Sequence, residues 1–195
     1  MAITINHQTN DISATSGSLT IDGAAAGGGA WNLISTATVS TAVAFVDFTS
    51  LTGYDHYCVV VSQVAHATSG SGLCLQPLSS GTPDTSGYRY ELFAGDNGAW
   101  VSDKSTSASF VKIIKNVYNA ASLPSASVVN ISSLNEAAHT NIYGTSSGFY
   151  SASGRFGPQI FGGSNYNGSV RDGVRLLSSS GNITSGTFSV YGVSS

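Results

Sequence analysis

The sequence predicts an all-β protein, an antiparallel β-sandwich of jelly-roll type with an extended N-terminal arm. Residues 43–64 contain long β-branched and aromatic runs that require cover on both faces, which places them at the centre of a two-layer domain. Short β-prone segments then recur about every 8 to 15 residues, between turns rich in Gly, Ser, Asn, Asp and Pro. No segment of ten residues or more follows a helical period, so the jelly-roll type is reached by elimination as much as by direct evidence.

The first 30 residues are predicted to form a separate arm that ends in a Gly-rich hinge, and residues 31–195 the sandwich domain. The arm has too few apolar side chains to bury them by itself, so it must lie on its own domain, on a sister subunit or on a larger assembly. The hinge, GAAAGGGA, is followed by a strand and not by a helix, which argues against a phosphate loop. The predicted anchoring residues of the arm are Ile3, Ile5, Ile12, Leu19 and Ile21.

Residues 43–64 are predicted to form a hairpin with its turn at residues 51–53, and later strands are expected to fold onto it. Residues 134–139 could make one helical turn. The turn at residues 180–182 suits a positive φ, after which Ile183, or Phe188 with Val190, would point into the core. The predicted strands are 31–38, 42–48, 56–64, 72–76, 88–93, 110–117, 127–132, 141–150, 158–161, 174–178 and 186–193.

Composition argues against several function classes. Seven Lys and Arg against ten Asp and Glu, without a basic cluster, make nucleic acid an improbable partner. No stretch has the roughly 18 apolar residues of a membrane helix, so no membrane insertion is expected. The N-terminus lacks the basic and apolar regions of a secretory signal. The two cysteines, Cys58 and Cys74, are expected to be buried free thiols, although a bridge between them stays open.

The sequence carries no constellation of catalytic residues, and no metal or cofactor site is predicted. A G-x-S-x-G elbow is absent, and most acidic residues fall in predicted turns, where they cap backbone N–H groups. Asp84 and residues 96–98 could bind calcium, but plain turns are the favoured interpretation. No histidine has a second metal ligand at suitable spacing; the four are His7, His56, His66 and His139.

Aromatic residues near loops are the most suggestive surface feature. Aromatic faces next to amide groups suit sugar binding, but they also suit a subunit interface, which is the favoured interpretation. The predicted surface-binding residues are Tyr88, Tyr90, Trp100 and Tyr166.

Two stretches resemble a domain of tailed-bacteriophage virion proteins. One is DFTSLTGYDHYCVVVSQVAHATSGSGLCLQ, residues 47–76, and the other is VRLLSSSGNITSGTFSVYGV, residues 174–193. The resemblance implies a structural component of the virion surface, most simply a capsid decoration or head-fibre protein anchored to phage capsid or tail proteins by its arm. The alternative is a tail-fibre or receptor-binding tip that recognises host surface carbohydrate. A homotrimer is the expected oligomer, because closed symmetric assemblies are the default and the arm is thin.

Overall fold

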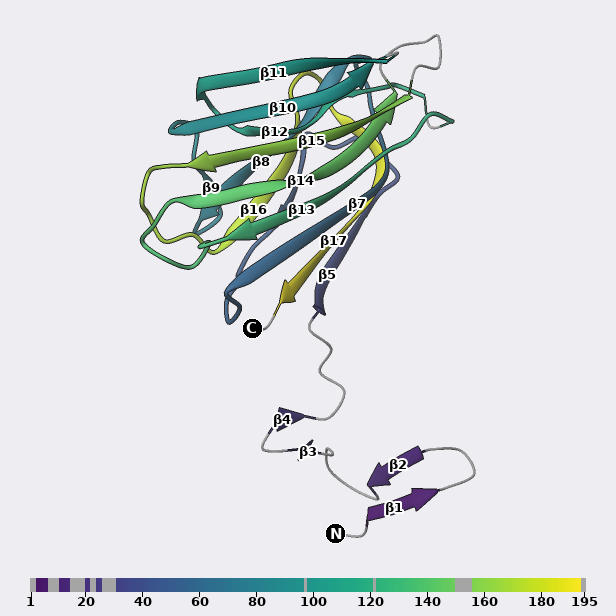
Figure 1. Cartoon of the computed structure of the whole chain (residues 1–195), viewed down its shortest axis with the longest axis vertical. Helices are drawn as coiled ribbons and strands as arrows, with labels where there is room; N and C mark the ends of the chain where they lie inside the picture. The colour runs from purple at the N-terminus through teal and green to yellow at the C-terminus, as the bar shows by residue number, and fades with distance from the viewer. Residues whose placement is uncertain are drawn as a thin grey trace.

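The computed structural model describes residues 3–6, 11–14, 20–21, 24–25, 31–96, 98–120, 122–149 and 156–193. Residues 31–193 contribute two antiparallel sheets, which confirms the predicted all-β sandwich (Figure 1). The jelly-roll type stays a prediction.

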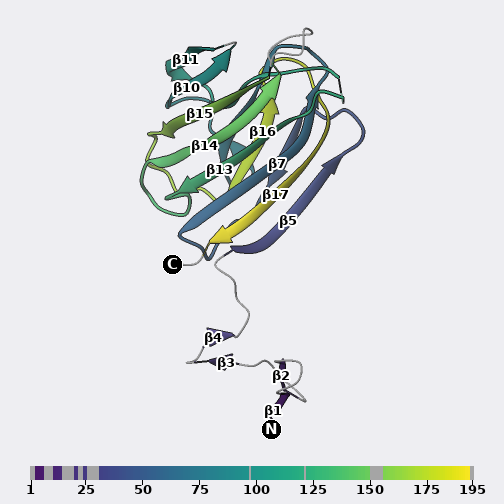
Figure 2. The ribbon, with the colours of Figure 1, turned by 45° about the vertical axis from the view of Figure 1, so that its right-hand side comes forward.

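The larger sheet has eight strands in the order β11-β10-β15-β14-β13-β7-β17-β5, and it crosses the front of the molecule in Figure 2. Each strand pairs antiparallel with its neighbours. Their bounds are β5 Trp31–Val39, β7 His56–His66, β10 Tyr88–Asp96, β11 Ala99–Ala108, β13 Ser125–Ser132, β14 Thr140–Phe149, β15 Phe156–Asn165 and β17 Ile183–Val193.

The smaller sheet has five strands and covers one face of the larger sheet. Its order is β12-β8-β16-β6, and β9 pairs with β8. The bounds are β6 Phe45–Phe48, β8 Ser71–Ser79, β9 Thr82–Pro83, β12 Val111–Val117 and β16 Gly173–Ser178. The core lies between the sheets, where alternate residues of both meet. Strand β8 is buried almost throughout, as is typical of a strand covered on both faces.

The described part of residues 1–30 shares no sheet with the sandwich. Strand β1 (Ile3–Asn6) pairs only with β2 (Asp11–Ala14), and β3 (Thr20–Ile21) only with β4 (Ala24–Ala25). The register places Ile5 opposite Ile12. Of the predicted anchoring residues, Leu19 lies outside the described residues.

The predicted hairpin within residues 43–64 is wrong. Strand β6 pairs with β16 in the small sheet, whereas β7 pairs with β13 and β17 in the large sheet. The turn between them therefore passes from one layer to the other. The reason is that Val46 and Phe48 on β6 and Tyr57 and Val59 on β7 are all buried, so both strands fill the core from opposite sides.

Strand β11 was not predicted, because its sequence, AWVSDKSTSA, is mostly polar. It pairs with β10 along Tyr88–Asp96 and forms one edge of the large sheet. Residues 134–139 contain turns and bends and no helical turn.

The last strand agrees with the sequence interpretation. Ile183, Phe188 and Val190 are all fully buried, and Gly181 in the preceding turn has φ +75°. Both cysteines are free and buried, in different sheets, as favoured. Burial raises the pKa of the Cys58 thiol to about 11 and raises that of Cys74 as well.

Candidate functional site

The candidate site is the outer face of the large sheet, by which we mean the face turned away from the small sheet. Alternation assigns its residues, because buried Tyr88, Tyr90 and Leu92 on β10 point inward and Arg89, Glu91 and Phe93 point outward. The same alternation runs through β15 and β13.

An exposed apolar row crosses the middle of this face. Phe93 on β10 lies opposite Ile160 on β15, and both side chains are exposed, Ile160 to 56%. Thr145 on β14 follows Ile160, and Val128 on β13, also exposed, follows Thr145. Cross-strand neighbours lie about 5 Å apart, so this row is a continuous strip and not a set of scattered apolar residues.

The edge strand β5 is a second apolar feature. Trp31 is 50% exposed and Leu33 59% exposed, and Ile34 is exposed too. The Trp31 ring touches only one described aromatic partner, Tyr191 of β17, at a centroid distance of 5.8 Å. On its other side, β5 has no neighbouring strand among the described residues, so its backbone groups remain available for pairing.

Two of the predicted surface-binding residues are buried, which corrects that prediction. Tyr88 has no exposed surface, and its hydroxyl donates to the Asp84 carbonyl at 3.0 Å. Tyr90 is 8% exposed and donates to the Asp103 carboxylate at 3.1 Å. Burial raises the pKa of both phenols. The two tyrosines are core residues because they alternate with Arg89 along β10, and the side of the strand that carries the tyrosines faces the small sheet.

The other two predicted surface residues are exposed but lie far apart. Trp100 on β11 is 58% exposed and lies opposite Gly95. Tyr166 is 40% exposed and follows β15, where its backbone N–H donates to the Gly87 carbonyl. Gly87 precedes β10 and Gly95 lies near its end, so the two positions are roughly 25 Å apart. The two aromatics therefore cannot bind one small ligand.

The structure brings Arg89, His139 and Ser164 together with Tyr166 around a depression of about 330 Å³. The Arg89 guanidinium carbon lies 5.1 Å from the Tyr166 ring centre, and the His139 ring meets the Tyr166 ring edge-on at 6.5 Å. Sequence reasoning missed Arg89. The signal that could have found it is the alternation Tyr88-Arg89-Tyr90 in a predicted strand. If the two tyrosines point into the core, the arginine between them must point outward.

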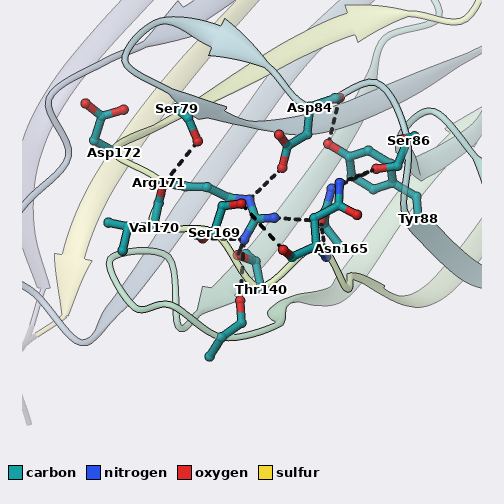
Figure 3. A network of polar contacts seen from close by, with 12 residues as sticks. Ser79, Asp84, Ser86, Tyr88, Thr140, Asn165, Ser169, Val170, Arg171 and Asp172 are labelled. Carbon is teal, nitrogen blue, oxygen red and sulfur yellow. Dashed lines mark hydrogen bonds and ion pairs between the residues drawn. The ribbon is translucent and has the colours of Figure 1, made fainter.

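A buried arginine holds the loops at this end of the sandwich (Figure 3). Arg171 has no exposed surface, and its guanidinium donates to residues of three loops and of the adjoining ends of β14 and β15. Because two of these loops carry His139 and Tyr166, the cluster fixes the end of the candidate site. The acceptors are Asp84 Oδ2 at 2.8 Å, Asn165 Oδ1 at 2.7 Å, the Ser169 carbonyl at 2.7 Å, Thr140 Oγ1 at 3.1 Å and the Ala138 carbonyl at 3.4 Å.

A second polar cluster surrounds His66, inside the sandwich. Its Nδ1 lies 2.8 Å from Ser71 Oγ and 3.1 Å from Ser178 Oγ, and all three residues are buried. Burial lowers the pKa of His66 to about 4, against the opposing effect of its hydrogen bond with Ser71. The cluster joins β7, β8 and β16, and no carboxylate of the described ranges orients the imidazole in the manner of a catalytic triad.

Several carboxylates already have cationic partners. Asp84 binds Arg171, Asp47 binds Arg175 through two bonds of 2.8 and 2.7 Å, and Asp103 binds Lys112 at 2.7 Å. Of the residues considered for calcium binding, Asn97 lies outside the described residues. Within the described ranges, no group of three or more His, Cys, Asp or Glu side chains could hold a metal ion. The described residues contain no helix that is long and apolar enough to cross a membrane.

No protein-family model, curated protein or solved structure matches the chain.

Proposed function

We propose that this protein is a structural component of a phage virion, a capsid decoration or head-fibre protein displayed on the particle surface and anchored through residues 1–30. The proposal rests on the resemblance of residues 47–76 and 174–193 to tailed-phage virion domains. It gives the protein an assembly role and no catalytic one.

The exposed β5 edge is the observation that carries an assembly role. Trp31, Leu33 and Ile34 expose apolar surface on a strand with one free backbone edge, directly after the arm. Natural sheets protect such edges with charges, prolines or a partner, and β5 contains neither a charged residue nor a proline. A partner chain that adds to β5 would satisfy the backbone and cover the side chains. This favours a homo-oligomer, with a trimer as the expected state, or docking on capsid or tail proteins.

Native mass tests the oligomer. Light scattering should give the mass of a trimer for the full-length protein and a smaller mass for the Leu33→Lys, Ile34→Lys double variant. Two exposed substitutions leave the core unchanged, so near-UV circular dichroism should match. A monomer in both samples would contradict self-assembly through β5.

Location on the particle needs a separate measurement. Antibodies against the protein, applied to purified phage particles that encode it, should label the head surface in electron micrographs. Labelling confined to the tail tip would favour the receptor-binding alternative over decoration. Absence of the protein from the particles would refute the virion proposal.

A further inference from the structure

The apolar row on the outer face of the large sheet has a symmetric pattern. It continues beyond Val128, because Val60 on β7 lies opposite Val128. The row therefore crosses five neighbouring strands, from β10 to β7, with β14 in the middle. Two apolar residues flank Thr145 on each side, large ones toward β10 and smaller ones toward β7. In strand order the residues are Phe93, Ile160, Thr145, Val128 and Val60.

The two halves of the row differ in relief. A hollow of about 360 Å³ lies over β7, β13 and β14, on the side where the small apolar residues are. On the other side of β14, Ile160 is 56% exposed and Phe93 44%, so their side chains stand out as a ridge. The same face thus carries a ridge and a hollow next to each other. The outward-facing residues that line the hollow are Val60, Ser62, Ala126, Val128, Thr145 and Ser147.

No charged side chain of the described residues interrupts the ridge or the hollow. The adjacent row toward the end of β15 is also uncharged, since Pro158 lies opposite Ser147, and Ser147 opposite Ala126. Charged residues of the face begin on the other side of the apolar row, with Glu91 on β10 opposite Lys104 on β11. An apolar centre with aromatic residues and a charged rim is the composition of a protein–protein contact.

The face is large enough for such a contact. Five strands about 4.8 Å apart span roughly 24 Å, and four outward positions along a strand such as β10 span roughly 27 Å. Each copy therefore offers roughly 650 Å², and a pair roughly 1,300 Å², at the low end of specific interfaces. A contact of this size should form a reversible pair, with a dissociation constant in the micromolar range.

We propose that two copies of the chain pack their outer faces together about a two-fold axis that runs along β14. Sheets packed in this way lie about 10 Å apart with their strands aligned. The axis places β15 of each copy over β13 of the other, and β10 over β7. Ile160 of each chain then enters the hollow beside Val128 of the other, Phe93 covers Val60, and Thr145 faces its own copy. The contact is isologous, so both ridges and both hollows are filled.

The pairing is independent of association through β5 and of any location on a particle. Strand β5 lies outside the five strands of the contact, so its unpaired edge stays available. At low micromolar concentration the face-to-face pair should be dissociated, and the trimer mass expected from β5 is unaffected.

Sedimentation of the full-length Leu33→Lys, Ile34→Lys variant tests the pairing without a contribution from β5. The mass should rise from monomer toward dimer as the concentration increases from micromolar to several hundred micromolar. Ile160→Lys, added to this variant, should weaken the dimer roughly tenfold or more, because it buries an amine in an apolar contact. Val170→Lys is the matched control, since Val170 is also 56% exposed but lies between β15 and β16, away from the face.

Cross-linking in the same variant tests the axis. A short bismaleimide should join two Thr145→Cys chains rapidly, because this position faces its own copy, and the native thiols are buried. Thr36→Cys is the control. Thr36 is exposed on β5, in line with the same row through Ser189 and Val60. Its two copies would lie eight strand spacings apart, roughly 38 Å, and should not be joined.

A monomer at every concentration would overturn the proposal, as would equal dimer affinities in the Ile160→Lys and Val170→Lys variants. Equal cross-linking at the two cysteine positions would refute the axis along β14. If Ile160→Lys leaves the dimer unchanged but abolishes attachment to purified phage particles, the face binds another virion protein and not a second copy. Circular dichroism checks that the variants remain folded.

Discussion

Arg171 Nε lies 2.8 Å from Asp84 Oδ2, and the arginine side chain has no exposed surface while the aspartate keeps 20%. The pair thus reaches from the interior to the surface. A buried guanidinium is tolerated only while its charge is balanced and its donors are satisfied.

Asp84→Ala should therefore destabilise the protein strongly. The substitution leaves the Arg171 cation buried without a counter-charge, and we expect a loss of about 3 kcal/mol in the free energy of unfolding, the lower end for a broken buried pair because Asp84 is partly exposed. Urea denaturation measures it. Asp47→Ala is the matched control, because its partner Arg175 is 17% exposed and can regain water, so we expect a loss of only about 1 kcal/mol. Equal losses in the two variants would contradict a special role for Arg171.

Stability should fall with acidification because of His66. Its folded pKa of about 4 lies below the value near 6.5 expected in the unfolded chain. The unfolded state therefore binds the proton first. The contribution is fully present above pH about 6.5 and is lost as pH falls toward 4, by about 3 kcal/mol at most. Unfolding free energies at pH 7 and pH 4.5 should differ less in His66→Gln than in the wild type. Parallel pH slopes would refute the assignment to His66.

Two glycines on neighbouring strands should respond differently to alanine. At Gly144 a Cβ would collide with the Val128 carbonyl oxygen and come within 2.9 Å of Phe161 Cζ, whereas at Gly162 it would meet open space. We expect Gly144→Ala to cost about 1–3 kcal/mol and Gly162→Ala less than about 0.5 kcal/mol. Thermal unfolding measures both, and similar melting temperatures for the two variants would show that β14 yields to the added methyl.

The cysteine thiols should resist modification in the native protein. Both are buried, and burial raises the pKa of Cys58 to about 11, so little thiolate forms at neutral pH. A chromogenic disulfide reagent should react slowly in buffer and rapidly with both thiols in denaturant. Rapid native reaction, or only partial reaction after unfolding without reductant, would argue against two buried free thiols.

Removing residues 1–23 should leave the sandwich folded. As far as the structure describes the chain, the strands of the two sheets of the body pair only with one another. Far-UV circular dichroism and the melting temperature should therefore stay close to those of the full-length protein, while association with capsid or tail proteins should disappear. An unfolded truncation would show that the arm belongs to the core.

The sequence was sufficient for the strands whose alternation is strong. Residues 186–193 and 56–64 are recognisable as strands because buried Val and Phe alternate or run together there. Strand β11 was missed since an edge strand buries only one shallow face, at Val101 and Ala108, and can be polar elsewhere. Pairing partners were also beyond reach. The sequence predicts a hairpin from β6 to β7 because sequence proximity does not reveal which layer a strand joins.

The candidate site was less predictable for the same reason. Tyr88 and Tyr90 are aromatic residues near a loop and so fit the pattern of a binding surface, yet both face inward and Arg89 between them faces outward. Gly162 and Tyr143 become neighbours of Glu91 only through the pairing of β14 and β15, and of β15 with β10. His66 joins Ser178 from more than a hundred positions along the chain. Such convergence depends on strand order, which local patterns do not encode.

The pairing of β5 with β17 has a consequence for how the protein is made. Strand β5 opens the sandwich in sequence, yet its only neighbour among the described strands of the large sheet is β17, Ile183–Val193. A ribosome must therefore release the chain as far as Val193 before Trp31–Val39 can pair, and the backbone of this strand stays unpaired until then. Such long-range closure slows folding and exposes an aggregation-prone edge. Chaperone demand during translation should accordingly concentrate on the first strand of the body.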